Sequence, residues 1–123
     1  MAKKSVLIVD DSPAVRNALR SSFKTFPEFE VSGEAENGQE AIEKAERLKP
    51  DLIILDLSMP VMNGLEAAVP LRKILPNARL MLFTAHDGPE VQRLADMAGI
   101  HVVVAKSQAA TLIAQAQALM AEQ

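Results

Sequence analysis

The chain has 123 residues, of which 49% are hydrophobic, with a net charge of −3 and no cysteine. This composition suits one folded domain and excludes a disordered chain, a disulfide scaffold and thiolate chemistry. The mild acidity does not favour nucleic-acid binding, no apolar run approaches the ~20 residues that cross a membrane, and the amino terminus lacks a signal peptide, so we expect one cytoplasmic domain over residues 1–123.

Strand and helix patterns alternate along the chain. Short apolar runs predict five strands, and four of these are apolar on both faces, as in a parallel sheet that helices cover on both sides. The second run alternates instead, which suits an edge strand. In chain order we predict a strand at Ser5–Val9, a helix from Pro13 to Phe26, a strand at Phe29–Ala35, a helix at Ala41–Leu48, a strand at Leu52–Leu55, a helix at Leu65–Leu75, a strand at Arg79–Thr84, a helix at Val91–Ala98, a strand at His101–Ala105 and a helix at Leu112–Met120.

Several helices carry local signals. Ser12 and Pro13 mark a helix start, because serine caps helix N-termini and proline suits the first helical position. Pro70 lies inside the third helical pattern and predicts either a kink or a late start. The last helix has no charge before Glu122, so it is either well buried or the surface of a dimer or partner.

Reactive side chains stand where the predicted strands end. Repeated strand–helix units imply a parallel sheet with right-handed crossovers, and ligands bind at the carboxyl ends of such strands. Those ends carry Asp10 and Asp11, Asp56, Thr84 and Lys106. We therefore expect these five residues to converge on one edge of the sheet.

The convergent groups suit phosphoryl transfer. At ~5 Å and an effective dielectric of ~20, two adjacent aspartates repel by ~3 kcal/mol, and a shared cation would offset that repulsion. Three carboxylates favour Mg²⁺, while Lys106 and Thr84 can hold phosphoryl oxygens. Each residue alone has an ordinary interpretation, as a turn acid, strand-end hydroxyl or surface lysine; their predicted convergence favours the functional one.

Four motifs carry a resemblance to a known family. "VLIVDDSP", "DLIILDLSMPVMNGLE", "LFTAH" and "VVVAKS" resemble the response-regulator receiver domain of bacterial two-component signalling, in its chemotaxis-regulator-like form. The resemblance covers the whole chain. It implies a doubly wound α/β fold, a flavodoxin-like (βα)5 three-layer sandwich whose five parallel strands have the order 2-1-3-4-5.

The resemblance also implies roles for individual residues. Asp56 would be the phosphoacceptor, and Mg²⁺ would be bound by Asp11, Asp56 and the backbone carbonyl of Ser58, with Asp10 acting through water; Thr84 and Lys106 would bind the phosphoryl group. The protein would catalyse only its own phosphorylation and dephosphorylation, and would not otherwise be an enzyme.

Partners follow from the same resemblance. A histidine kinase or phosphotransfer protein would donate the phosphoryl group and dock near Val15 and Leu19. A downstream protein, or a second copy in a dimer, would bind the face formed by Pro89–Ala98 with the last strand and helix. We expect no direct contact of this domain with nucleic acid or membrane.

The chain departs from the family pattern at several positions. Val103 replaces the usual aromatic residue on the last strand, so a coupled aromatic flip cannot occur there. Ser107 replaces the proline that usually follows the lysine, so we expect a trans Lys106–Ser107 bond and a serine cap on the last helix. Ser58 and His86 stand where the family tunes hydrolysis, although His86 also suits an exposed loop; we expect His101 to be structural.

Two alternative functions remain open at this point. A degenerate receiver would act as a constitutive protein-interaction module, which the changes at Val103 and Ser107 would favour. A Mg²⁺-dependent aspartyl phosphatase is a distant third, because such enzymes place a second acid two residues after the nucleophile, where this chain has Ser58.

Overall fold

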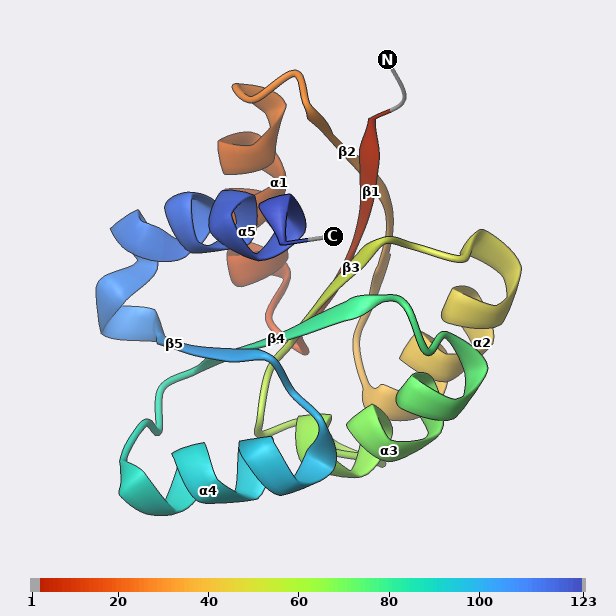
Figure 1. Cartoon of the computed structure of the whole chain (residues 1–123), viewed down its shortest axis with the longest axis vertical. Coiled ribbons are helices and arrows are strands. Elements are labelled where there is room, and N and C mark those ends of the chain that lie inside the picture. The colour runs from red at the N-terminus through yellow and green to blue at the C-terminus, as the bar shows by residue number, and fades with distance from the viewer. Residues whose placement is uncertain (1–2, 123) are drawn as a thin grey trace.

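A computed structural model describes residues 3–122. Strands and helices alternate along the chain (Figure 1). The elements are β1 (Lys4–Val9), α1 (Pro13–Lys24), β2 (Phe29–Ala35), α2 (Gly38–Leu48), β3 (Leu52–Leu55), α3 (Gly64–Ile74), β4 (Arg79–Thr84), α4 (Pro89–Ala98), β5 (Val102–Ala105), a 3-10 helix (Lys106–Thr111) and α5 (Leu112–Ala121). The predicted strands are confirmed to within one residue at each end. None of the described helices is both long enough and apolar enough to span a bilayer.

The strands form one parallel sheet in the order β2-β1-β3-β4-β5, which confirms the predicted doubly wound fold. β2 lies at an edge, as its alternating pattern predicted. α1 and α5 cover one face of the sheet, and α2, α3 and α4 cover the other (Figure 1). After β2 the chain crosses back over β1 to β3, so the strand order switches between β1 and β3. The carboxyl ends of β1, β3, β4 and β5 lie at one edge of the sheet.

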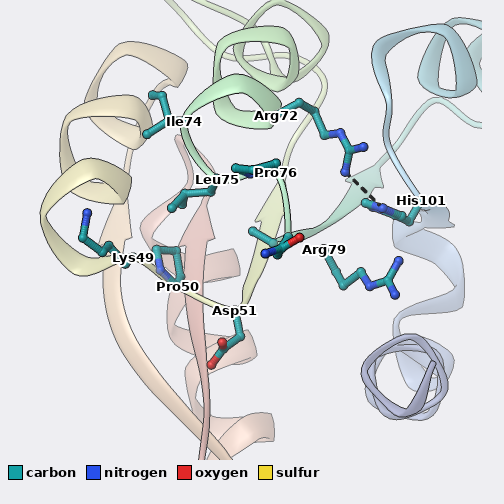
Figure 2. A pocket seen from close by; sticks show the side chains of 11 residues that line it. Lys49, Pro50, Asp51, Arg72, Ile74, Leu75, Pro76, Arg79 and His101 are labelled. Carbon is teal, nitrogen blue, oxygen red and sulfur yellow. Dashed lines mark hydrogen bonds between the residues drawn. The ribbon is translucent and has the colours of Figure 1, made fainter. Parts of the chain in front are cut away.

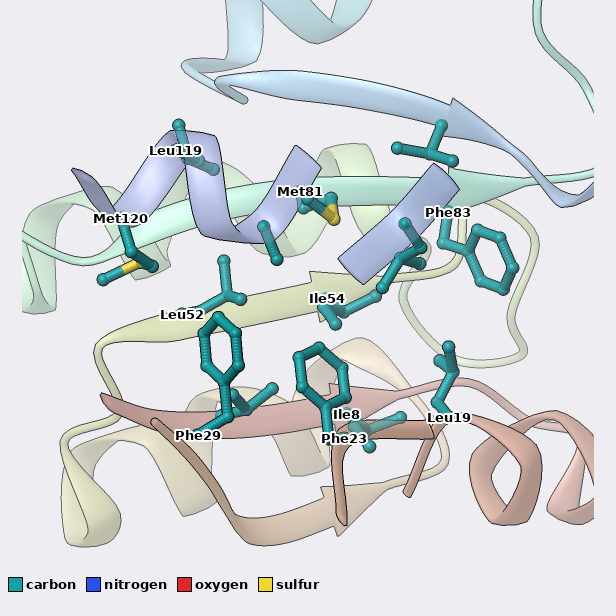
Figure 3. Close-up of a cluster of buried hydrophobic side chains, with 14 residues drawn as sticks. Ile8, Leu19, Phe23, Phe29, Leu52, Ile54, Met81, Phe83, Leu119 and Met120 are labelled. Carbon is teal, nitrogen blue, oxygen red and sulfur yellow. The ribbon is translucent and has the colours of Figure 1, made fainter. Parts of the chain in front are cut away.

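The strands supply a hydrophobic core on each face. Val6 and Ile8 point into the core under α1 and α5, while Leu7 and Val9 point into the core under α2, α3 and α4. The first core holds most of the aromatic rings, with Phe23 and Phe29 packed edge to face at 5.1 Å between centroids (Figure 3). Burial on both faces explains why the central strands are continuous apolar runs.

Of the two alternatives for Pro70, the late helix start is wrong, and the predicted serine cap on the last helix is wrong as well. α3 begins at Gly64, so Pro70 lies inside the helix and does not delay its start. Asn63 and Glu66 form a capping box that fixes the first turn of α3. Ser107 does not cap α5, because residues 106–111 form a 3-10 helix and α5 begins only at Leu112, without a side-chain cap. The tighter 3-10 turn carries the chain away from Lys106 before Leu112 enters the core.

The apolar composition of α5 is explained by burial. Leu112, Ala116, Leu119 and Met120 are buried in the core under α1 and α5. The large apolar side chains that are exposed among residues 3–122 lie on other elements: Val61, Val69, Leu94 and Met97. No cis peptide bond occurs in the described part of the chain, so the Lys106–Ser107 bond is trans as predicted.

Candidate functional site at the carboxyl edge of the sheet

Hydrogen bonds of its backbone and of its carboxylate fix Asp10 at the end of β1. Its N–H donates to the Ala35 carbonyl at 3.0 Å, which extends the β1–β2 ladder by one residue. Its carboxylate oxygen Oδ1 accepts from the Ser12 N–H at 2.9 Å, and its carbonyl accepts from Arg16 Nη1 at 2.7 Å. The Asp10 side chain is only 2% exposed, so its negative charge is fixed beneath the loop that leads into α1.

Asp56 lies in the same position at the end of β3. Its N–H donates to the Val9 carbonyl at 2.9 Å, so the two strand ends are joined directly. The N-terminus of α3 presses against it: a Cβ on Gly64 would lie 2.3 Å from the Asp56 carbonyl oxygen. Only glycine fits this approach, which explains why the asparagine–glycine pair follows Asp56 at this distance in sequence.

The loop between Asp56 and α3 is closed by a strained turn. The Met62 N–H donates to the Pro60 carbonyl at 2.7 Å, and the residue between them, Val61, has a φ of 69°. A β-branched residue rarely adopts a positive φ, because its side chain then crowds the backbone. The strain is sustained by the fixed ends of the loop at Asp56 and Asn63.

Three carboxylates and one ammonium group meet at this edge. Carboxylate oxygens of Asp10, Asp11 and Asp56 all lie within 4.8 Å of one another. Lys106 Nζ lies 2.9 Å from Asp10 Oδ2 and 3.6 Å from Asp56 Oδ2. The predicted convergence of these four residues is therefore confirmed. Asp10 pairs with Lys106 and Asp11 is exposed to water, and both features lessen the repulsion between the two aspartates.

The electrostatics of the site follow from this crowding. Burial raises the pKa of Asp56 above its ordinary value, and the neighbouring charge of Asp10 raises it further, against the opposing effects of Lys106 and the Ser58 N–H. Burial alone would lower the pKa of Lys106, but its hydrogen bond and charge interaction with Asp10, together with the charge of Asp56, raise it overall. Negative charge on Asp56 is thus unfavourable until a further cation approaches.

The remaining predicted residues lie around this cluster. Thr84 is fully buried at the end of β4, and its Oγ1 accepts from the His86 N–H at 3.0 Å. Ser58 and His86 are exposed in the loops after β3 and β4. Val103, beside Leu82 on β5, is partly buried against the core under α2, α3 and α4.

A partly buried network of ion pairs next to the site was missed in the sequence. Glu34 at the end of β2 pairs with Arg16 and Arg20 of α1, the former at 3.1 Å between Oε1 and Nε. Because Arg16 also holds the Asp10 carbonyl, this network anchors the β1–α1 loop to the edge strand. Arg16 and Arg20 stand four residues apart, so they share one face of α1, and that spacing is the pattern that could have revealed the pair.

The two predicted docking residues on α1 differ in how far their side chains are exposed. Leu19 is only 6% exposed and belongs to the core, so its prediction as a docking residue is wrong: its face of α1 turns towards the sheet. Val15 is half-buried and packs against the same core.

Known proteins match this chain over nearly its whole length. Residues 6–117 match the family model of the response regulator receiver domain. The chain is 41% identical over 112 residues to the response regulator protein VraR of Staphylococcus saprophyticus, covering 90% of this chain and 53% of that protein. It therefore spans about half the length of this relative.

Solved structures agree with the sequence comparison. A LuxR-family two-component response regulator from Aurantimonas superposes with a TM-score of 0.93 at 31% identity, covering 99% of this chain and 88% of that one. The CheX–CheY–BeF3–Mg²⁺ complex from Borrelia burgdorferi gives 0.78 at 25% identity, covering 85% of this chain and 78% of that one. The chain belongs to the response-regulator receiver-domain family of two-component systems.

Proposed function

We propose that the chain is a phospho-accepting signalling switch, in which residues 1–123 act as one receiver domain and Asp56 accepts a phosphoryl group from a histidine kinase or phosphotransfer protein. The observation that carries the proposal is the cluster of Asp10, Asp11 and Asp56 within 4.8 Å, bridged by Lys106. A nucleophilic carboxylate, two further acids and a cation are the groups that phosphoryl transfer requires.

The acidic cluster fits Mg²⁺. Its donors are all carboxylate oxygens, which this hard cation prefers. Burial, and then the charge of Asp10, raises the pKa of Asp56, so a cation at this site would favour its charged form. Asp11 and Asp56 would hold the ion directly with the Ser58 carbonyl, and Asp10 through water. When bound, Mg²⁺ would neutralise charge on the carboxylates and on the transferred group.

The protein's own groups have distinct tasks in the transfer. An oxygen of the Asp56 carboxylate attacks phosphorus, and the bond from phosphorus to the donor's leaving group breaks. Lys106 Nζ, 3.6 Å from Asp56 Oδ2, is placed to move onto a phosphoryl oxygen while the product remains beside it. Thr84 Oγ1 already accepts the His86 N–H, so its own hydroxyl proton is free to donate to a second phosphoryl oxygen.

Phosphorylation of Asp56 would change the positions of Thr84 and Lys106, and the strands that lead to these residues would transmit the change to the surface of α4. The group adds about −1.5 to −2 charges at neutral pH, and it would draw on the ends of β4 and β5 together. The adjoining surface of α4 exposes Leu94 and Met97, the latter 78% exposed, which suits a downstream partner. Because Val103 replaces the aromatic residue, the change would pass through the backbones of β4 and β5 and not through a ring flip.

The test is intact mass after incubation with Mg²⁺ and a small-molecule acyl phosphate. We expect one phosphoryl adduct in the wild type, none in Asp56→Asn, and none when EDTA replaces Mg²⁺. Asp87→Asn is the matched control, since it removes an exposed acid from the loop after β4 and should label normally.

Other outcomes would decide between the alternatives. An absence of adduct under conditions where a control receiver labels would favour a degenerate receiver that binds partners constitutively. Sustained turnover of an unrelated phosphate ester would favour an aspartyl phosphatase. Exposed Ser58, two residues after Asp56, supplies no general acid for that reaction.

A further inference from the structure

A depression of about 640 Å³ lies at the amino edge of the sheet, opposite the acidic cluster. It is lined by the segment that joins α2 to β3, the end of α3 and the starts of β4 and β5 (Figure 2). Its cationic lining side chains are Lys49, Arg72 and Arg79, with the imidazole of His101 beside them, against a single carboxylate, Asp51. The surface of the depression is therefore rich in cationic and donor groups.

Within residues 3–122, the carboxylate of Asp51 forms no ion pair with these cations. Its Oδ2 accepts from the Ser5 N–H at 2.8 Å and from the Ser5 hydroxyl at 3.3 Å, so it is bound to β1. Figure 2 shows it turned away from Arg72 and His101. The ion pairs found in residues 3–122 involve neither Arg72 nor Arg79.

His101 presents a donor, not an acceptor, to Arg72. Its Nδ1 accepts the N–H of Leu80 at 3.0 Å, and that buried N–H needs an acceptor. A neutral imidazole that accepts at Nδ1 carries its proton on Nε2. Nε2 lies 3.3 Å from Arg72 Nη1, which can only donate, so two donors face each other with no acceptor between them.

Further features of Arg79, Arg72 and His101 favour an anionic ligand in this depression. Nε of Arg79 is buried and has no hydrogen-bond partner. Arg72 is held in place, because its side chain passes so close to Gly99 that a Cβ there would lie 3.0 Å from Nε. Burial and then the charges of Arg72 and Arg79 lower the pKa of His101. The groups are thus positioned and positively biased before any ligand arrives.

We propose that this depression binds a small phosphate-bearing anion, whose oxygens accept from the Arg72 guanidinium and the His101 Nε2–H, with Arg79 beside them. Guanidinium groups bind phosphate through paired hydrogen bonds. The volume falls within the range of about 300–1,000 Å³ that is typical of small-molecule sites. A concave site of this size favours a small ligand over an extended acidic chain. The proposal is independent of phosphorylation at Asp56, which lies at the other edge of the sheet.

The test is a titration of the wild-type protein with sodium pyrophosphate, at constant ionic strength with EDTA present, followed by NMR of the two imidazole side chains. We expect the His101 resonance to shift to saturation and its pKa to rise, because a bound anion stabilises the imidazolium. His86 is the internal control, since it lies at the carboxyl edge and should not respond. EDTA removes the divalent ions that could draw pyrophosphate to the acidic cluster.

A pair of variants tests the assignment. Arg72→Gln should weaken binding by about 10- to 100-fold, the loss expected for one charged hydrogen-bonding group. Arg93→Gln makes the same charge change on the exposed surface of α4 and should leave binding unchanged. The proposal is overturned if His101 shows no saturable shift, if only His86 responds, or if an acidic peptide shifts His101 at lower concentration than pyrophosphate. The wild-type titration decides these outcomes even if Arg72→Gln folds poorly.

Discussion

At the scale of single residues, the candidate site stores unfavourable charge. Asp10 is 2% exposed and Asp56 is 6% exposed, and they share a single lysine. Lys106 Nζ lies 2.9 Å from Asp10 Oδ2 but 3.6 Å from Asp56 Oδ2, so the lysine compensates the charge of Asp56 less well than that of Asp10. A carboxylate in this position gains from any added cation, which is a useful property in a residue that is to take up a charged group.

Replacing Asp56 should therefore stabilise the protein in the absence of metal. We expect Asp56→Asn to raise the free energy of unfolding by about 1–3 kcal/mol at neutral pH, because it removes a carboxylate whose pKa is raised in the folded state, keeps the size of the side chain and leaves Lys106 paired with Asp10. Urea denaturation in EDTA measures the change. Asp87→Asn, in an exposed loop, should shift stability by less than about 0.5 kcal/mol. A less stable Asp56→Asn protein would contradict the electrostatic account.

His101 should make stability depend on pH. Burial and the charges of Arg72 and Arg79 lower its pKa in the folded state, so the unfolded chain binds a proton more readily. Stability should then fall as pH drops through the unfolded value of about 6.5, and level off below the folded pKa. His101→Asn should remove this part of the pH dependence, whereas His86→Asn, at an exposed position, should keep it. Denaturation curves between pH 5 and pH 8 give the comparison, and parallel profiles for wild type and His101→Asn would refute it.

At the scale of elements, the start of α3 shapes the site. Asn63 Oδ1 accepts the Glu66 N–H at 2.8 Å, and the Glu66 carboxylate accepts the Asn63 N–H at 3.0 Å, so the first turn of the helix is capped in both directions. This cap holds Gly64 against the Asp56 carbonyl. The loop between Asp56 and Asn63 must therefore connect two points that lie close together, and Val61 in this loop has a positive φ. The start of α3, the strained turn at Val61 and Asp56 therefore form one structural unit.

A methyl group on Gly64 should disrupt that unit. A Cβ there would meet backbone at 2.3 Å, so Gly64→Ala must displace either the loop or the helix. We expect a loss of about 2–4 kcal/mol in stability, and slower labelling of Asp56 in the remaining folded protein. Gly88→Ala is the matched control, because nothing lies within 4 Å of its Cβ position. Thermal and urea denaturation distinguish the two, and equal stabilities would show that the approach to Asp56 can relax.

At the scale of the whole molecule, function depends on segments far apart in the chain. Asp10, Asp56 and Lys106 meet only because β1, β3 and β5 are parallel strands of one sheet whose two faces are covered by helices. A ligand shared by these residues would bind only the folded state. Binding should therefore appear as global stability.

Mg²⁺ should stabilise the whole fold by mass action. At a Mg²⁺ concentration of about 100 times the dissociation constant, the gain would be about 2.7 kcal/mol. Asp11→Asn should lose most of the gain, because it removes one of the three clustered carboxylates, whereas Asp87→Asn should keep it. Melting temperature measured against MgCl₂ at constant ionic strength reports the effect. A gain that survives Asp11→Asn would place the ion elsewhere.

The sequence by itself determined the strands, the sheet class and the residues at its carboxyl edge. Continuous apolar runs can be buried only between two layers of helices, and parallel strands bring their carboxyl ends together, so Asp10, Asp56 and Lys106 could be grouped before any coordinates. The strand order itself came from the resemblance to receiver domains, and the sheet confirmed it.

Only the tertiary structure decided which side chains take which partner. Lys106 pairs with Asp10 at 2.9 Å, Leu19 turns into the core, and Ser107 lies in a 3-10 helix. The donor-rich depression around Arg72 and His101 is also invisible in the sequence, because its walls come from three separate segments. Periodicity constrains which face of an element is buried, whereas the partner of a polar side chain depends on distances between elements, and those distances exist only once the layers have packed.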